Sequence, residues 1–213
     1  MVLSLFLKPR EVIRHSLEEP NIAMAIFLNI LPALISFISM AAFGIIIAAN
    51  SFIASLISPA VTTIVLALLT YLLAASLAKI PRRRNFLGIW QAFSFGWVFL
   101  AIVSLLFAGF IFVTIPGLSE LVHLKANDAI TNDEFIARLG AILQNTPDFG
   151  FWAGFVGGVS LLLMLYMLIY WYMVLQEVVP TSRLKQLCSY LIILAITTFV
   201  GFLRDSIILS VFS

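Results

Sequence analysis

Residues 20–78 read PNIAMAIFLNILPALISFISMAAFGIIIAANSFIASLISPAVTTIVLALLTYLLAASLA and contain no Asp, Glu, Lys or Arg. A helix needs about 20 apolar residues to cross the hydrocarbon core of a bilayer. These 59 residues are therefore too many for one crossing and enough for two. We predict a helical hairpin with spans over 22–49 and 52–78. Its turn is expected at Asn50 and Ser51, the most polar dipeptide near the middle of the stretch.

The rest of the chain is equally poor in charge. Only 10% of the 213 residues are charged and 62% are hydrophobic, whereas a soluble domain carries about 25% charged residues. Three more spans are predicted over 86–115, 149–175, and 187–203 or slightly beyond. The apolar runs are continuous and do not alternate, which excludes strands. We predict an all-α, polytopic membrane protein that forms one domain over 1–213, a bundle of five transmembrane helices.

The basic residues indicate how the spans are oriented. Short loops rich in Lys and Arg stay in the cytoplasm. Counting by parity of crossing, one side of the membrane holds nine bases and the other three. The nine are Lys8, Arg10, Arg14, Lys79, Arg82, Arg83, Arg84, Arg183 and Lys185, against Lys125, Arg138 and Arg204. We therefore predict a protein of the cell membrane with its N-terminus in the cytoplasm and its C-terminus outside. The aromatic run of Tyr170, Trp171 and Tyr172 should mark the inner interface, and Phe151 with Trp152 the outer one.

The segment before the first span has two parts. Met1 to Leu7 is apolar but is followed by charge, and it lacks a cleavage site, so we do not predict a signal peptide. From Pro9 to Glu19 the apolar residues share one side of a helix and the charged residues another. We interpret 1–20 as a short helical segment on the cytoplasmic interface. A plain polar flank of the first span is the alternative.

The outer loop, residues 116–148, is the longest segment predicted outside the membrane. Thr131 and Glu134 have the spacing of a capping box, and Phe135, Leu139 and Leu143 recur at helical intervals. A short amphipathic helix is expected here. It could cover the spans, close the mouth of the bundle or contact a partner.

Few polar residues fall inside the predicted spans. Asn29 lies close to Pro32, and it could bond to a neighbouring helix, to a freed backbone carbonyl, or to a substrate. Gln91 lies in the third span. Glu177 is expected at the inner boundary, paired with Arg183 or Lys185. Arg204 either ends the fifth span or anchors it near the outer interface.

Small residues recur at intervals of four in two spans. Gly150, Gly154 and Gly158 do so in the fourth span, and Ala92 with Gly96 in the third. Such repeats allow helix backbones to approach closely. We predict tight helix packing at these positions, either within one chain or between two copies.

Residues for catalysis or metal binding do not converge in the sequence. Cys188 is the single cysteine, and His15 and His123 fall on opposite sides of the membrane. No hydrolase, metalloprotease or phosphate-binding motif is present. We expect no enzyme activity, no metal and no cofactor. The net charge of +2 gives no reason to expect nucleic acid as a partner.

Three short stretches give the chain a resemblance to a known family. They are LKPREV at 7–12 with Pro20 after it, FLGIWQAFSFG at 86–96, and WYMVLQEV at 171–178 followed by a basic turn. In these stretches and in its five-span layout the chain resembles the Yip family, the Ypt-interacting proteins, and in particular a prokaryotic-type member with a short N-terminal segment. The resemblance implies a non-enzymatic membrane protein, because family members act in vesicle traffic, bind GTPases and one another, and shape membranes.

Two functional hypotheses follow. The first is a membrane scaffold or membrane-organising protein whose basic loop, Lys79, Arg82, Arg83 and Arg84, meets anionic lipid or a protein partner. Other membrane proteins, or a second copy of the chain, are further candidate partners. The second is a small transporter, channel or permease subunit with Asn29 and Gln91 bordering a path. The bases could also serve only to fix the topology.

Overall fold

The computed structural model describes residues 2–42, 49–76, 85–115, 117–127, 129–179 and 181–212. All regular structure in these ranges is helical, in the order α1 (Val2–Leu7), α2 (Pro9–Glu18), α3 (Ile22–Ala42), α4 (Ala49–Ser76), α5 (Phe86–Ser94), α6 (Trp97–Thr114), α7 (Leu118–Ala126), α8 (Asn132–Asn145), α9 (Phe149–Val178) and α10 (Arg183–Phe212). Five stretches are long and apolar enough to cross a membrane, beginning at Ile22, Ser55, Phe86, Phe149 and Arg183. The predicted fold class is therefore confirmed.

The second helix of the first hairpin begins before the predicted turn. Asn50 and Ser51 lie in the first turn of α4, which begins at Ala49, while α3 extends to Ala42. The predicted turn at Asn50 and Ser51 is therefore wrong. These small polar residues are tolerated in the first turn of a helix, where backbone N–H groups have no partner within the helix. Proline is present inside both helices, at Pro32 and Pro59.

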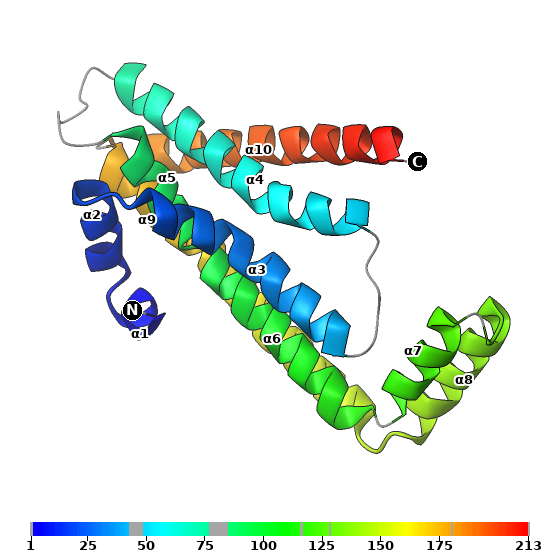
Figure 1. Ribbon diagram of the computed structural model, residues 1–213. Helices are drawn as coiled ribbons and strands as arrows, with labels where there is room; N and C mark the ends of the chain where they lie inside the picture. Colours follow the sequence, from blue (N-terminus) through cyan, green and yellow to red (C-terminus); the bar gives the residue numbers. More distant parts are fainter. Residues whose placement is uncertain are drawn as a thin grey trace.

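The long spans converge at one end of the bundle and diverge toward the other (Figure 1). At the converging end, which we call the α2 end, lie α2, the beginnings of α3, α5 and α10, and the ends of α4 and α9. From there α3, α6 and α9 run side by side, and α4 and α10 follow a different direction. The core contains side chains from this end, such as Ile13, Leu66, Phe93, Tyr170 and Leu175.

The helix predicted before the first span is α2, and it packs on the bundle. Ile13 and Leu17 are buried, and Arg10, Arg14 and Glu18 are exposed, as the amphipathic pattern predicted. The helix contacts α5 and α9. A Cβ added to Gly88 on α5 would lie 2.9 Å from the carbonyl oxygen of Ser16, so a glycine is needed for this close approach.

The segment between α6 and α9 contains two helices where one was predicted. Thr131 caps α8 and Glu134 returns the bond, which confirms the predicted capping box. The helix that the sequence did not predict is α7, which packs against α8. Together they form a hairpin that extends from the far ends of α6 and α9 (Figure 1).

Candidate functional site: a buried polar cluster beside a break in the third span

The third predicted span, residues 86–115, is interrupted in its first half. Helix α5 ends at Ser94 and α6 begins at Trp97. Around the break the backbone makes tighter bonds than an α-helix: Gly96 donates to the Phe93 carbonyl at 3.0 Å and Phe99 to the Gly96 carbonyl at 3.2 Å. Residues 91–99 are all buried. Such a break is tolerated at membrane depth where the backbone is buried in protein or lines a water-filled cavity.

Trp171 of α9 fills the space beside this break. Its indole N–H donates to the Phe93 carbonyl at 2.9 Å, and its ring meets that of Trp97 edge to face at 5.6 Å between centroids. A Cβ added to Gly96 would lie 2.1 Å from the indole nitrogen. Gly96 therefore leaves room for the Trp171 side chain, Ala92 is fully buried, and a close approach of helix backbones at these two residues stays a prediction.

Tyr170 and Trp171 are therefore core residues and do not belong to an interfacial belt. Their exposed fractions are 0% and 4%, so neither ring faces lipid, and their depth near the inner interface stays a prediction. The sequence shows only that aromatic residues lie near the end of a span, and this is true of both a belt and a core. At the other end of α9, Phe151 and Trp152 are exposed, as a belt requires.

A cluster of four hydrogen-bonded side chains lies next to the break. Asn29, which is 1% exposed, donates through Nδ2 to the Ala25 carbonyl and to Ser94 Oγ, both at 2.8 Å. Thr63 Oγ1 donates to Asn29 Oδ1 at 2.7 Å and accepts from Trp90 Nε1 at 3.0 Å. We call these residues, Asn29, Thr63, Ser94 and Trp90, the Asn29 cluster. It joins α3, α4 and α5.

The chemistry of the Asn29 cluster is that of a structural joint. An asparagine amide has two donor hydrogens, and the structure uses both within the protein. The cluster contains no group that titrates near neutral pH. Of the alternatives for Asn29, the structure shows the bond to a neighbouring helix. The contact with a substrate stays untested.

Gln91 makes a second polar connection between the same helices. It is 5% exposed, and its Oε1 accepts the backbone N–H of Asn21. The Asn21 side chain in turn accepts from Met24 N at 3.0 Å and caps α3. Gln91 thus fixes the start of α3 against α5.

At the surface of the α2 end, Glu177 pairs with Arg14. The Arg14 guanidinium donates to both carboxylate oxygens of Glu177, at 3.2 and 3.4 Å, and this bond together with the charge of Glu177 raises the pKa of Arg14. The predicted partners, Arg183 and Lys185, were wrong. The pair joins α2 to α9 across 163 positions of sequence, which no local pattern reveals.

Of the remaining predicted residues, the structure describes the glycine repeat and does not describe the basic loop. A Cβ added to Gly150, Gly154 or Gly158 would meet nothing within 4 Å, so these glycines do not make the predicted close contact within the described part of the chain. Contact with a second copy stays a prediction. The basic loop, Lys79, Arg82, Arg83 and Arg84, lies outside the described residues.

Arg204 lies within a helix that continues past it. α10 extends to Phe212, while the stretch of it that is apolar enough to cross a membrane runs from Arg183 to Arg204, so both alternatives for Arg204 stay predictions. Its Nη1 donates to the Ser58 carbonyl on α4 at 3.1 Å. Arg204 therefore connects the two helices that diverge together from the rest of the bundle.

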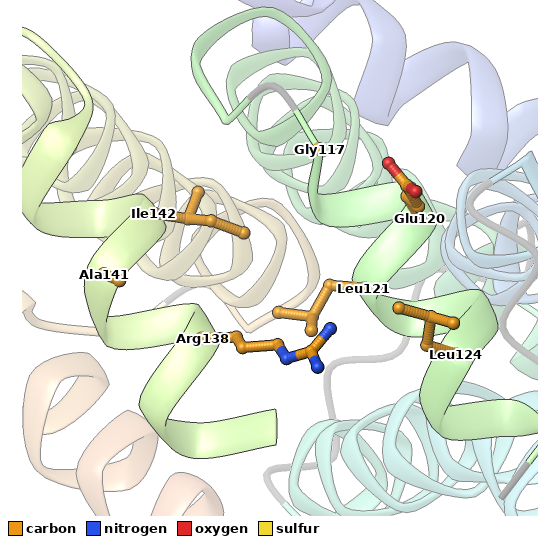
Figure 2. Close-up of a pocket in the computed structure, with 7 residues that line it drawn as sticks. All are labelled: Gly117, Glu120, Leu121, Leu124, Arg138, Ala141 and Ile142. Carbon is orange, nitrogen blue, oxygen red and sulfur yellow. The ribbon is translucent and has the colours of Figure 1, made fainter. Parts of the chain in front are cut away.

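An open groove separates α7 from α8, with a volume of about 390 Å³. Its lining combines apolar side chains with Glu120 and Arg138, one from each helix. Figure 2 shows the Arg138 side chain extended across the groove toward Leu121 and Leu124, and Glu120 directed away from it. Among the described residues, no three His, Cys, Asp or Glu side chains lie close enough together to hold a metal ion.

Comparison of the chain with family models, with curated proteins and with solved structures finds no match. The fold and the site therefore define its class. It is a multi-pass α-helical membrane protein whose spans are joined by buried hydrogen bonds beside a break in the third span.

Proposed function

We propose that the protein is a Yip-like, non-enzymatic membrane scaffold or membrane-organising protein. In this proposal it resides in the cell membrane with the α2 end in the cytoplasm and the C-terminus outside. Its partners are anionic lipid headgroups and other membrane proteins, which include a second copy of the chain.

The exposed basic residues of the α2 end carry the proposal. Lys8, Arg10, Arg14, Arg183 and Lys185 are all exposed there. Residues 79–84 connect α4 to α5, so their four bases follow helices that meet at the same end. Near an anionic membrane surface each such base is worth about 1 kcal/mol. The opposite face of α2, with Ile13 and Leu17, is buried in the core.

The use of the polar groups inside the bundle also favours a scaffold. The amide, hydroxyl and indole groups of the Asn29 cluster bond to one another and to backbone. Titratable side chains of the α2 end, such as Arg14, Glu11 and Glu18, lie at its surface. A catalytic centre needs titratable groups that converge on a substrate, so this distribution favours packing and surface contacts.

The test is to neutralise the basic loop and measure how much anionic lipid and which protein partners stay bound. In the variant R82Q/R83Q/R84Q we expect less phosphatidylglycerol to be retained during purification in mild detergent, as measured by native mass spectrometry. The matched control K125Q/R138Q removes bases from the α7–α8 hairpin and should keep the lipid. A tag at each terminus checks that topology is unchanged. Equal retention of lipid, and of crosslinked protein partners, in all three proteins would contradict the proposal.

The break in the third span favours a second candidate, a small transporter, channel or permease subunit. Interrupted helices line the substrate sites of many transporters, and here the Trp97 indole nitrogen beside the break is buried without a hydrogen-bond partner. Proteoliposomes would be tested for leak of protons, K⁺ and small neutral solutes. Flux above that of empty vesicles, abolished by N29L, would establish this function. Flux equal to that of empty vesicles would remove it.

A further inference from the structure

The first six helical residues, α1, pack against the spans through one face only. Leu5 is 1% exposed. The Phe6 ring stacks on Tyr166 at 5.7 Å and meets Phe99 edge to face at 5.1 Å. Tyr166 OH donates to the Phe6 carbonyl at 3.1 Å. Contacts with α6 and α9 therefore fix α1 in place.

The opposite face of α1 is apolar and uncovered. Leu3 and Leu7 are each 71% exposed, and their spacing of four places them on the same side of the helix. Two exposed leucines on so short a segment would be unfavourable in water, since burying a leucine side chain is worth about 1.5–3 kcal/mol.

The contacts of α1 also give its depth in the membrane. The 30 residues of α9 make a helix about 45 Å long, longer than the hydrocarbon core of about 30 Å. If Phe151 and Trp152 mark one interface, the core ends about 20 residues further along, near Trp171. Tyr166 then lies about 5 to 10 Å inside the hydrocarbon. Because Phe6 stacks on Tyr166, α1 lies at this depth as well.

We infer that α1 is inserted into the lipid leaflet at the α2 end, with Leu3 and Leu7 among the acyl chains. On α9 beside Tyr166, Leu162, Leu165 and Ile169 are also exposed, so the two leucines extend an apolar surface that already faces lipid. Lys8 follows at once, with its side chain 63% exposed and paired with Glu11, in position to reach the headgroups. α1 is thus the part of the N-terminal segment that enters the bilayer, and α2 lies on the headgroup side of it.

This inference requires that the five spans cross a bilayer with Phe151 and Trp152 at one interface, and it does not depend on the proposed function. It is tested with a single nitroxide label on a C188S background in proteoliposomes of phosphatidylethanolamine and phosphatidylglycerol. Labels at L3C and L7C are compared with two controls. F155C reports lipid, because Phe155 is 57% exposed within a span. E11C reports water, because the Glu11 side chain on α2 is 69% exposed.

Collision rates with oxygen, which concentrates in the bilayer, and with a water-soluble nickel chelate give the environment of each label. We expect the ratio of the two rates at positions 3 and 7 to match that at 155 and to exceed that at 11 several-fold. A ratio like that at 11 would overturn the inference. So would low collision rates with both reagents, because they would show that protein, such as a second copy, covers the leucines.

A second variant tests what holds α1 in place. F6A on the L3C background removes the ring that packs between Phe99 and Tyr166. The spectrum of the label at position 3 should become more mobile, while that of a label at 155 in an otherwise matched F6A protein stays unchanged. An unchanged spectrum at position 3 would contradict the role assigned to Phe6.

Discussion

The two parts of α9 belong to one candidate membrane span and have different surroundings. Of its seven buried residues, five lie between Tyr170 and Val178, and only Val156 and Ser160 lie in the longer part before them. The later part is surrounded by α2, α5 and α10. In the earlier part, Phe151, Leu161 and Leu162 are exposed. Hydropathy therefore identifies the span, and the neighbours of each part decide whether it forms core.

Several hydrogen bonds between helices lie at the α2 end, while in the diverging part Arg204 bonds to the Ser58 carbonyl. The α2 end contains the Asn29 cluster, the bond from Trp171 to the Phe93 carbonyl, and the Arg14–Glu177 pair. In a bilayer, apolar side chains gain little by leaving lipid for protein, so polar contacts and close packing hold helices together. The α2 end should therefore supply most of the tertiary stability, and the diverging ends should tolerate change.

The largest expected change in stability comes from adding a methyl group at Gly96, and the same change at Gly154 serves as the comparison. G96A places a Cβ against the Trp171 indole, which should displace the ring and lower stability by about 1–3 kcal/mol. G154A places the same group in open space and should raise stability by up to about 1 kcal/mol through helix propensity. Thermal unfolding in detergent measures both. Equal changes in the two variants would remove the contrast between the two ends of the bundle.

The G154A variant also distinguishes the two interpretations of the glycine repeat. If Gly150, Gly154 and Gly158 contact lipid, G154A leaves the molecular mass of the particle unchanged. A loss of dimer in light scattering would show that the repeat packs against a second copy.

A smaller effect on stability is expected from removing hydrogen bonds of the Asn29 cluster. In a double-mutant cycle, N29A and T63V should be coupled by about 0.6 kcal/mol, and by no more than about 1.7 kcal/mol, the range measured for hydrogen bonds between transmembrane helices. N29A with S39A is the control. Ser39 bonds within its own helix, to the Ile35 carbonyl at 2.7 Å, and distant pairs are additive. Coupling as small as in the control would mean that the cluster does not join the helices energetically.

The sequence predicted the parts of the fold that depend on local pattern. Uninterrupted hydropathy gave the five spans, amphipathic spacing gave α2, and the pair of Thr131 and Glu134 gave the start of α8. In each case the physical cause lies within one helix or its cap, so a short window of sequence contains it.

The candidate site depended on contacts that no short window contains. The break at Phe95 and Gly96 falls within an apolar run without proline, and beside it the Phe93 carbonyl accepts the indole N–H of Trp171, which lies far along the chain. The pairing of Glu177 with Arg14 is equally remote. The sequence identified Asn29 as a joint because a buried amide in a span must find a hydrogen-bond partner. No pattern in the sequence indicated that its partners are Thr63 and Ser94.

The smallest expected effect is at the α7–α8 hairpin, away from the bundle core. The backbone N–H of Thr131 donates to the Glu134 carboxylate at 3.0 Å, and chiefly this bond lowers the pKa of Glu134 below its usual 4.5. A lowered pKa means that the capping contribution is complete above 4.5 and is lost as the pH falls through the lower folded value. Amide NMR signals of the first turn of α8 should shift in that range, while those near Asn29 stay unchanged.

In E134Q the transition should be absent. A transition that persists in E134Q, or that also moves the signals near Asn29, would show that acid acts on the bundle and that the hairpin is not independent of the α2 end.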